Sequence, residues 1–196
     1  MNRAEKSLIT KNKIFDIAVK FFNERGYYNT TISQICKEAN VAKGTFYVHY
    51  VSKEAIIKES YYLNLTQYIE ENYKLFESKY PTKAIHDKIL YFLNLELAFA
   101  KKVGLEITTL AFSFNMAESL EQNNAHFQKR TFSSILKNLI ENSKIENSEY
   151  STEYVFLVFE SLVRGIMATW CFSEGSFDII QDGQRMLTDT VNAYIK

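Results

Sequence analysis

Apolar residues recur every three or four positions along most of the chain, which is the spacing of an amphipathic α-helix. In the first such segment, residues 11–25, the side chains of Ile14, Ala18 and Phe21 share one face, and Gly26 follows as a stop signal. The same spacing predicts eight further helices, with cores at residues 31–39, 43–50, 53–80, 82–102, 107–114, 125–142, 152–173 and 178–195. We therefore expect an all-α protein of about nine helices.

The composition supports long helices and a reducing, cytoplasmic environment. There are one proline and six glycines, too few for the many turns of an all-β protein. The two cysteines, Cys36 and Cys171, lie in apolar helical segments and do not suggest a disulfide scaffold. The first twelve residues are polar, so we expect no secretion signal. The longest apolar stretch, residues 154–172, contains Glu160 and Arg164, which indicates a buried helix and not a membrane span.

Charge is distributed unevenly although the net charge is zero. Residues 1–58 carry ten Lys/Arg and five Asp/Glu, a net of +5, and residues 59–196 carry thirteen and eighteen, a net of −5. A basic end is a cue for a polyanion partner. From this change we place a domain boundary near residue 55, with a small head at 1–55 and a larger body at 56–196.

Residues 31–50 have the segment lengths and spacing of a helix-turn-helix unit. Two short helical segments flank a turn of three or four residues. Asn40 stands in the turn, and asparagine tolerates the left-handed conformation that such a turn requires. Ile35, Ala39 and Phe46 are expected to share one core with the first helix.

The second of these helices has an outer face suited to the major groove of DNA. Lys43 can donate to guanine O6 and N7, and Thr45 can bond a base edge or touch a thymine methyl group. Gly44 has no side chain, so the backbone can approach a duplex closely. Tyr47 and His49 carry donors for phosphate oxygens, and Lys53 opens the next helix, where its charge favours an anion.

The segment TISQICKEANVAKGTFYVHY at 31–50, followed by Ser52-Lys53-Glu54, resembles the signature of TetR/AcrR regulators, T-x-x-x-I-A-x-x-A-G-V-S-x-G-T-L-Y-x-H-F-x-S-K-E. The resemblance implies base contacts from Ala42, Lys43, Gly44 and Thr45. It implies phosphate contacts from Thr31, Tyr47, His49 and Lys53. Asn40 replaces the usual glycine, and Ala42 replaces a serine, so the recognition helix loses a cap worth about 0.5–2 kcal/mol. Cys36 and Tyr50 replace alanine and phenylalanine, which we expect to alter packing alone.

The body is rich in aromatic side chains, with twenty-one after residue 58. The simplest interpretation of any one of these aromatic residues is that it packs in the core. The family resemblance implies instead a pocket for a small, largely apolar effector. The candidate lining residues are Tyr91, Glu96, Phe114 and Trp170.

The resemblance also implies a homodimer formed by the last two helices, because Val163-Arg164-Gly165-Ile166 and Trp170 match a pattern of its dimerisation helices. The eighth helix is apolar nearly all round and needs cover on more than one side. Glu160 and Arg164 have the spacing of an intrahelical ion pair, and they are also candidates for the interface. The remaining interface candidates are Met167, Met186 and Val191. A dimer would read palindromic half-sites of double-stranded DNA.

We find no spacing that indicates an enzyme, a cofactor or a metal site. His86 and His126 lie in separate segments without ligand partners at metal spacing. The alternative to a DNA-binding regulator is a helical ligand carrier or interaction module that does not bind DNA.

Overall fold

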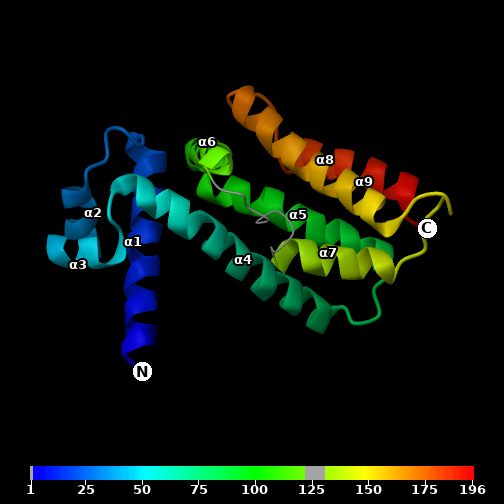
Figure 1. Ribbon diagram of the computed structural model, residues 1–196, viewed down its shortest axis with the longest axis horizontal. Helices are drawn as coiled ribbons and strands as arrows, with labels where there is room; N and C mark the ends of the chain where they lie inside the picture. Colours follow the sequence, from blue (N-terminus) through cyan, green and yellow to red (C-terminus); the bar gives the residue numbers. More distant parts are fainter. Residues whose placement is uncertain (1, 122–130) are drawn as a thin grey trace. The chain divides into compact units, whose positions relative to one another are not determined.

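The computed structural model describes residues 2–121 and 131–196, which form nine α-helices and no strand, as the apolar spacing predicted (Figure 1). An isolated bridge joins Ile145 and Ile195. The helices are α1 (Arg3–Arg25), α2 (Ile32–Ala39), α3 (Lys43–His49), α4 (Lys53–Lys79), α5 (Ile85–Val103), α6 (Leu105–Glu121), α7 (Thr131–Glu141), α8 (Thr152–Phe172) and α9 (Gln181–Tyr194). Ala125, the predicted start of the seventh helix, and His126 lie outside the described residues.

The chain divides into two compact units. The head unit contains Met1–Asn64 and Glu106–Glu118, and the body unit contains Leu65–Leu105 and Ser119–Lys196. The units separate inside α4, without a linker, and most of α6 belongs to the head unit. The division into domains at residue 55 stays a prediction.

In the head unit, α1 begins earlier than its apolar pattern indicates. The helix starts at Arg3 because Asn2 caps it: the Asn2 side chain accepts the Glu5 N–H, and the Glu5 carboxylate accepts the Asn2 N–H. The expected start at residue 11 was wrong because the first turns carry no apolar stripe. The buried face begins at Ile14 and continues through Phe22.

The body unit is organised around α5, which packs against α7, α8 and α9. A Cβ atom added to Gly183 on α9 would lie 2.6 Å from Leu97 Cδ1 on α5 and 3.3 Å from Ile166 Cγ2 on α8. The absence of a side chain therefore lets α9 lie close to both helices.

The most apolar helix, α8, carries a buried charge. Glu160 is fully buried and accepts a bond from Arg164 Nε at 2.9 Å, the intrahelical pair that its spacing predicts. Its other carboxylate oxygen accepts from the Ser133 hydroxyl of α7 at 3.1 Å. By length and composition alone, α8 could cross a membrane, but core helices of soluble proteins pass the same test.

Candidate nucleic-acid interface

The turn between α2 and α3 has the geometry that the sequence predicts. Asn40 adopts the left-handed conformation, with φ 54° and ψ 47°, and its N–H bonds back to the end of α2. Ala42 stands at the N-cap of α3 and makes no side-chain capping bond. Ile35, Ala39 and Phe46 are buried, so the two helices share the apolar side of the unit.

The outer face of α3 is open at its N-terminal end. Ala42, Lys43 and Gly44 are exposed, and Thr45 is half-buried. A Cβ atom placed on Gly44 would meet no atom within 4 Å. Nothing described inside the chain therefore requires glycine at this position, and the space in front of it is free for another molecule.

The residues expected to contact phosphates differ in exposure and in the hydrogen bonds that they already make. The Tyr47 side chain is 53% exposed, with its ring edge-on to Phe46. Burial lowers the pKa of His49 and the Lys11 ammonium lowers it further, which favours the neutral imidazole as a donor. The Thr31 hydroxyl accepts the Gln34 N–H at 3.3 Å and donates to Gln34 Oε1 at 2.9 Å, which caps α2.

Lys53 is engaged inside the head unit. Its Nζ donates to the carbonyl oxygens of Tyr27 at 2.5 Å and Thr30 at 3.0 Å, and it lies 4.1 Å from the centre of the Tyr27 ring. Burial lowers the pKa of Lys53, and the carboxylate of Glu106 opposes that shift. Lys53 thus fixes residues 26–31, the connector between α1 and α2.

A second group on this connector was not foreseen from the sequence. Glu106, in the first turn of α6, accepts the Tyr27 N–H at 2.8 Å across a separation of 79 residues. An acidic residue in a first helical turn is common, so the sequence contained no signal for this contact. Glu106 and Lys53 together hold both backbone polar groups of Tyr27, a few residues before the cap of α2.

Tyr50 also does more than the packing expected of it. Its buried hydroxyl donates to the Lys11 carbonyl at 3.2 Å and lies 2.5 Å from the Ser60 hydroxyl. Burial raises the pKa of Tyr50 to about 12. A phenylalanine could not make these bonds, so the expectation of a packing role alone was incomplete. Tyr50 joins the end of α3 to α1 and α4.

In the body unit, the residues predicted for an effector pocket are not all brought together. Tyr91 lines a surface groove of about 390 Å³ on α5. Glu96 and Trp170 are buried and do not line this groove. Phe114 belongs to the head unit, where the Lys58 ammonium lies 5.4 Å from its ring.

The residues predicted for a dimer interface also divide into two groups. Glu160, Met167 and Val191 are buried within the body unit, whereas Arg164 is partly exposed and Met186 is 43% exposed. The outer side of α8 exposes other residues. They include Tyr154, Leu157, Ser161, Gly165 and Phe172.

A short helix with an open, cationic N-terminal face, held by a left-handed turn on a three-helix core, defines a helix-turn-helix DNA-binding regulator. Residues 14–59 match the model of bacterial regulatory proteins of the tetR family. The head of the chain thus carries the DNA-binding region of this family, and the protein is a DNA-binding transcriptional regulator, not an enzyme.

Known regulators are similar over most of the chain. The negative regulator IcaR of the biofilm operon icaADBC, from Staphylococcus aureus (strain Newman), is 28% identical over 156 residues, which are 76% of this chain and 79% of IcaR. The regulator AcrR of Shigella flexneri is 21% identical over 194 residues, covering 95% of this chain and 89% of AcrR.

Solved structures share the fold. A tetR-family regulator from Mesorhizobium loti has a TM-score of 0.69 at 16% identity, with both chains covered completely. The regulator FadR of Bacillus subtilis, solved with stearoyl-CoA, has a TM-score of 0.63 at 21% identity and covers 92% of this chain and 97% of its own.

Proposed function

We propose that this protein is a cytoplasmic, homodimeric repressor that a small, largely apolar effector releases from a palindromic operator. The DNA-binding part of this proposal rests on the outer face of α3. A Cβ atom at Gly44 would contact nothing in the described chain, and Lys43 is exposed beside it. A recognition helix requires such a face, because side chains must reach base edges while the backbone lies close to the groove.

Within this proposal, Ala42, Lys43, Gly44 and Thr45 face the bases, and Tyr47 and His49 bind phosphate oxygens. Thr31 reaches a phosphate from the start of α2, where its hydroxyl also caps the helix. The contact of Lys53 with the connector indicates a double role. Two of its three N–H groups bind carbonyl oxygens, which leaves one for a phosphate.

The outer side of α8 supports a homodimer. Phe172 is 85% exposed and Leu157 is 52% exposed, which is costly for a helix facing water. Gly165 is exposed between them, and no atom lies within 4 Å of the position of its missing Cβ. A second copy of α8 packed there would cover these side chains. An isologous pair also supplies two recognition helices, which must lie about 34–36 Å apart to read successive major grooves.

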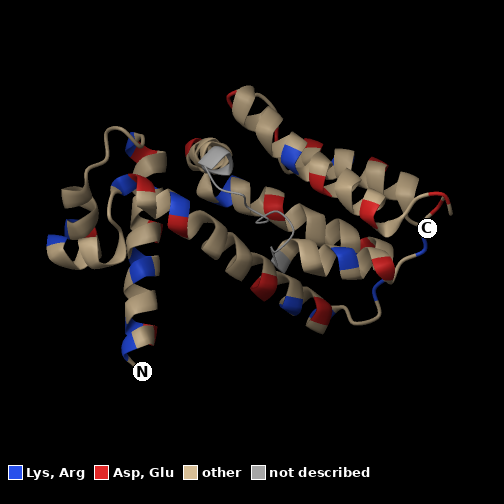
Figure 2. Cartoon of the chain, in the orientation of Figure 1, with Lys and Arg blue, Asp and Glu red and all other residues tan. Residues whose placement is uncertain are grey.

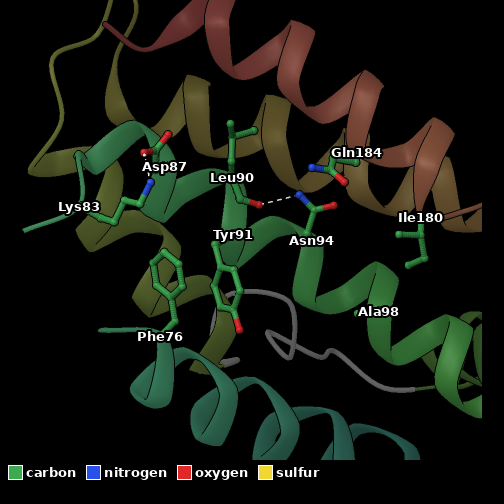
Figure 3. A pocket seen from close by; sticks show the side chains of 9 residues that line it. All are labelled: Phe76, Lys83, Asp87, Leu90, Tyr91, Asn94, Ala98, Ile180 and Gln184. Atoms are coloured by element: carbon green, nitrogen blue, oxygen red, sulfur yellow. Dashed lines mark hydrogen bonds and ion pairs between the residues drawn. The ribbon is translucent and has the colours of Figure 1, made fainter. Parts of the chain in front are cut away.

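The groove on α5 supports an effector site (Figure 3). Phe76 of α4 stacks on Tyr91 at 3.9 Å between ring centres, and Leu90, Ala98 and Ile180 add apolar surface. The NH₂ group of Asn94 donates to the Leu90 carbonyl, and its side-chain oxygen points away from that bond. Lys83, Asp87 and Gln184 add polar groups to the lining, so such a site suits a molecule with an apolar, planar body and polar groups at its edge. The effector shifts DNA binding only by its different affinity for the bound and free forms.

The test is binding of the duplex upstream of the gene at two salt concentrations. A regulator that makes about 6–10 phosphate contacts loses affinity by about 10³–10⁵-fold between 50 and 200 mM salt. Tyr47→Phe should weaken binding to all sequences alike, and Lys43→Ala should also relax base preference. A ligand carrier would bind no duplex at either salt concentration, and that result would refute the proposal.

A further inference from the structure

The N-terminal turns of α1 have no structural role inside the described chain. The first buried residue of α1 is Ile14, yet the helix starts eleven residues earlier at Arg3 and residues 2–9 are all exposed. Leu8 and Ile9 are 43% and 54% exposed. The Asn2–Glu5 capping box nevertheless starts a regular helix here. An exposed helical extension of this kind is costly to order. Its role therefore lies in contact with another molecule.

These turns carry their positive charge along one side. Arg3, Lys6 and Lys13 are spaced by three and seven residues, which places them within about 80° of one another around the helix axis. We call these three residues the basic stripe. The only acidic residue among positions 2–13 is Glu5, and its carboxylate accepts the Asn2 N–H. Figure 2 shows Lys and Arg positions recurring along α1.

The turns that carry the basic stripe belong to the same unit as the recognition helix. Lys11 lies on another side of α1, where it pairs with Glu59 at 2.9 Å and lies 5.1 Å from the centre of the Tyr50 ring. Its carbonyl accepts the Tyr50 hydroxyl, and its charge contributes to lowering the pKa of His49. Lys11 therefore marks where α1 passes the C-terminal end of α3. The turns that precede it extend beyond the recognition helix in the same unit.

We propose that the basic stripe is a second DNA contact, which binds backbone phosphates next to the bases that α3 faces. This inference rests on the DNA-binding function proposed above. From Arg3 to Lys13 the helix rises about 15 Å, enough to follow two or three phosphates of one strand. The contact carries no base preference, because Lys and Arg at phosphates position a protein without reading sequence. Leu8 and Ile9 are too few to form the apolar face of a membrane-bound helix.

The test compares two triple variants of the full chain. In the first, Arg3→Gln, Lys6→Gln and Lys13→Gln remove the basic stripe. In the matched control, Lys74→Gln, Lys79→Gln and Lys144→Gln remove three exposed charges of the body unit. Circular dichroism confirms equal helix content. The measurement is the slope of log K against log salt for an operator duplex and for an unrelated duplex.

Each phosphate contact contributes about −0.9 to this slope, so loss of the basic stripe should make it shallower by about 2 to 3 on both duplexes. The control should keep the wild-type slope. Trimming the base pairs outside the half-sites should weaken the wild type and leave the first variant unaffected. An unchanged slope for the first variant would overturn the inference while the DNA-binding function stands.

Two other outcomes also count against the inference. If the wild type binds no duplex, the proposed function itself fails, and the inference fails with it. If the first variant binds DNA normally but no longer binds vesicles of anionic lipid, the partner of the basic stripe is a membrane surface and the inference is wrong.

Discussion

Replacing Glu106 by alanine tests how the head unit holds its recognition helix. The carboxylate accepts the Tyr27 N–H at 2.8 Å in a partly buried setting, beside the ammonium of Lys53. Removing a charged acceptor from such a donor costs about 1.5–3 kcal/mol when the donor is buried. Because water reaches part of this site, we expect the lower end of that range. The connector, residues 26–31, should then lose one of the two groups that hold it.

The expected consequence is a weaker and less stable head unit. A loss of about 1.5 kcal/mol corresponds to roughly tenfold in an equilibrium constant, so Glu106→Ala should bind operator DNA up to about tenfold less tightly. The same free energy corresponds to a fall in Tm of roughly 3–6 °C when the 196-residue chain unfolds as one unit. Glu106→Gln keeps a neutral acceptor for the Tyr27 N–H and should retain most of both properties.

The assay is fluorescence anisotropy with a labelled operator duplex, together with thermal unfolding of the same samples. Lys53→Met serves as the companion variant, because it removes the bonds to the other side of the connector. If Glu106→Ala matched the wild type in both affinity and Tm, the connector would not depend on α6 and the reasoning would be wrong.

Three further substitutions probe separate features of the structure. Tyr50→Phe removes the bonds to Lys11 and Ser60 and should cost about 1 kcal/mol at pH 7. Because the pKa of Tyr50 is raised to about 12, its neutral form stabilises the fold below pH 10, and that stability is lost as pH rises towards 12. The free energy of unfolding, measured with urea, should therefore fall less steeply with pH for the variant than for the wild type. Gly183→Ala should lower the free energy of unfolding by about 1–3 kcal/mol, because its Cβ would lie 2.6 Å from Leu97; an unchanged urea midpoint would show that α9 can move aside. Ala42→Ser supplies the missing cap of α3 and should add about 0.5–2 kcal/mol, measured by thermal unfolding, whereas no gain would indicate that the backbone at this position cannot accept a cap.

Local features of the fold followed well from the sequence. The apolar spacing predicted the helices, and the tolerance of asparagine for positive φ predicted the turn at Asn40. The absence of a cap at Ala42 and the ion pair between Glu160 and Arg164 also agree with prediction. Each of these depends on residues within four positions of one another, where helix geometry fixes the outcome.

Contacts between distant segments were not predictable in the same way. Glu106 reaches Tyr27 across 79 residues, and Lys53 turns towards the connector, because of how α4 and α6 pack in the head unit. The start of α1 was missed for another reason. Its first turns are stabilised by a cap and not by an apolar stripe, so a search for periodic apolar residues passes over them.

We expect the exposed face of α3 to read DNA sequence. The most direct test of this expectation is the ratio of affinities for the operator and for a scrambled duplex of equal length, measured for the wild type, Lys43→Ala and the body-unit control Lys74→Ala. We predict a ratio that falls by about 5- to 150-fold for Lys43→Ala, since a good base contact is worth about 1–3 kcal/mol, and that stays unchanged for Lys74→Ala. Equal ratios for all three proteins would contradict it.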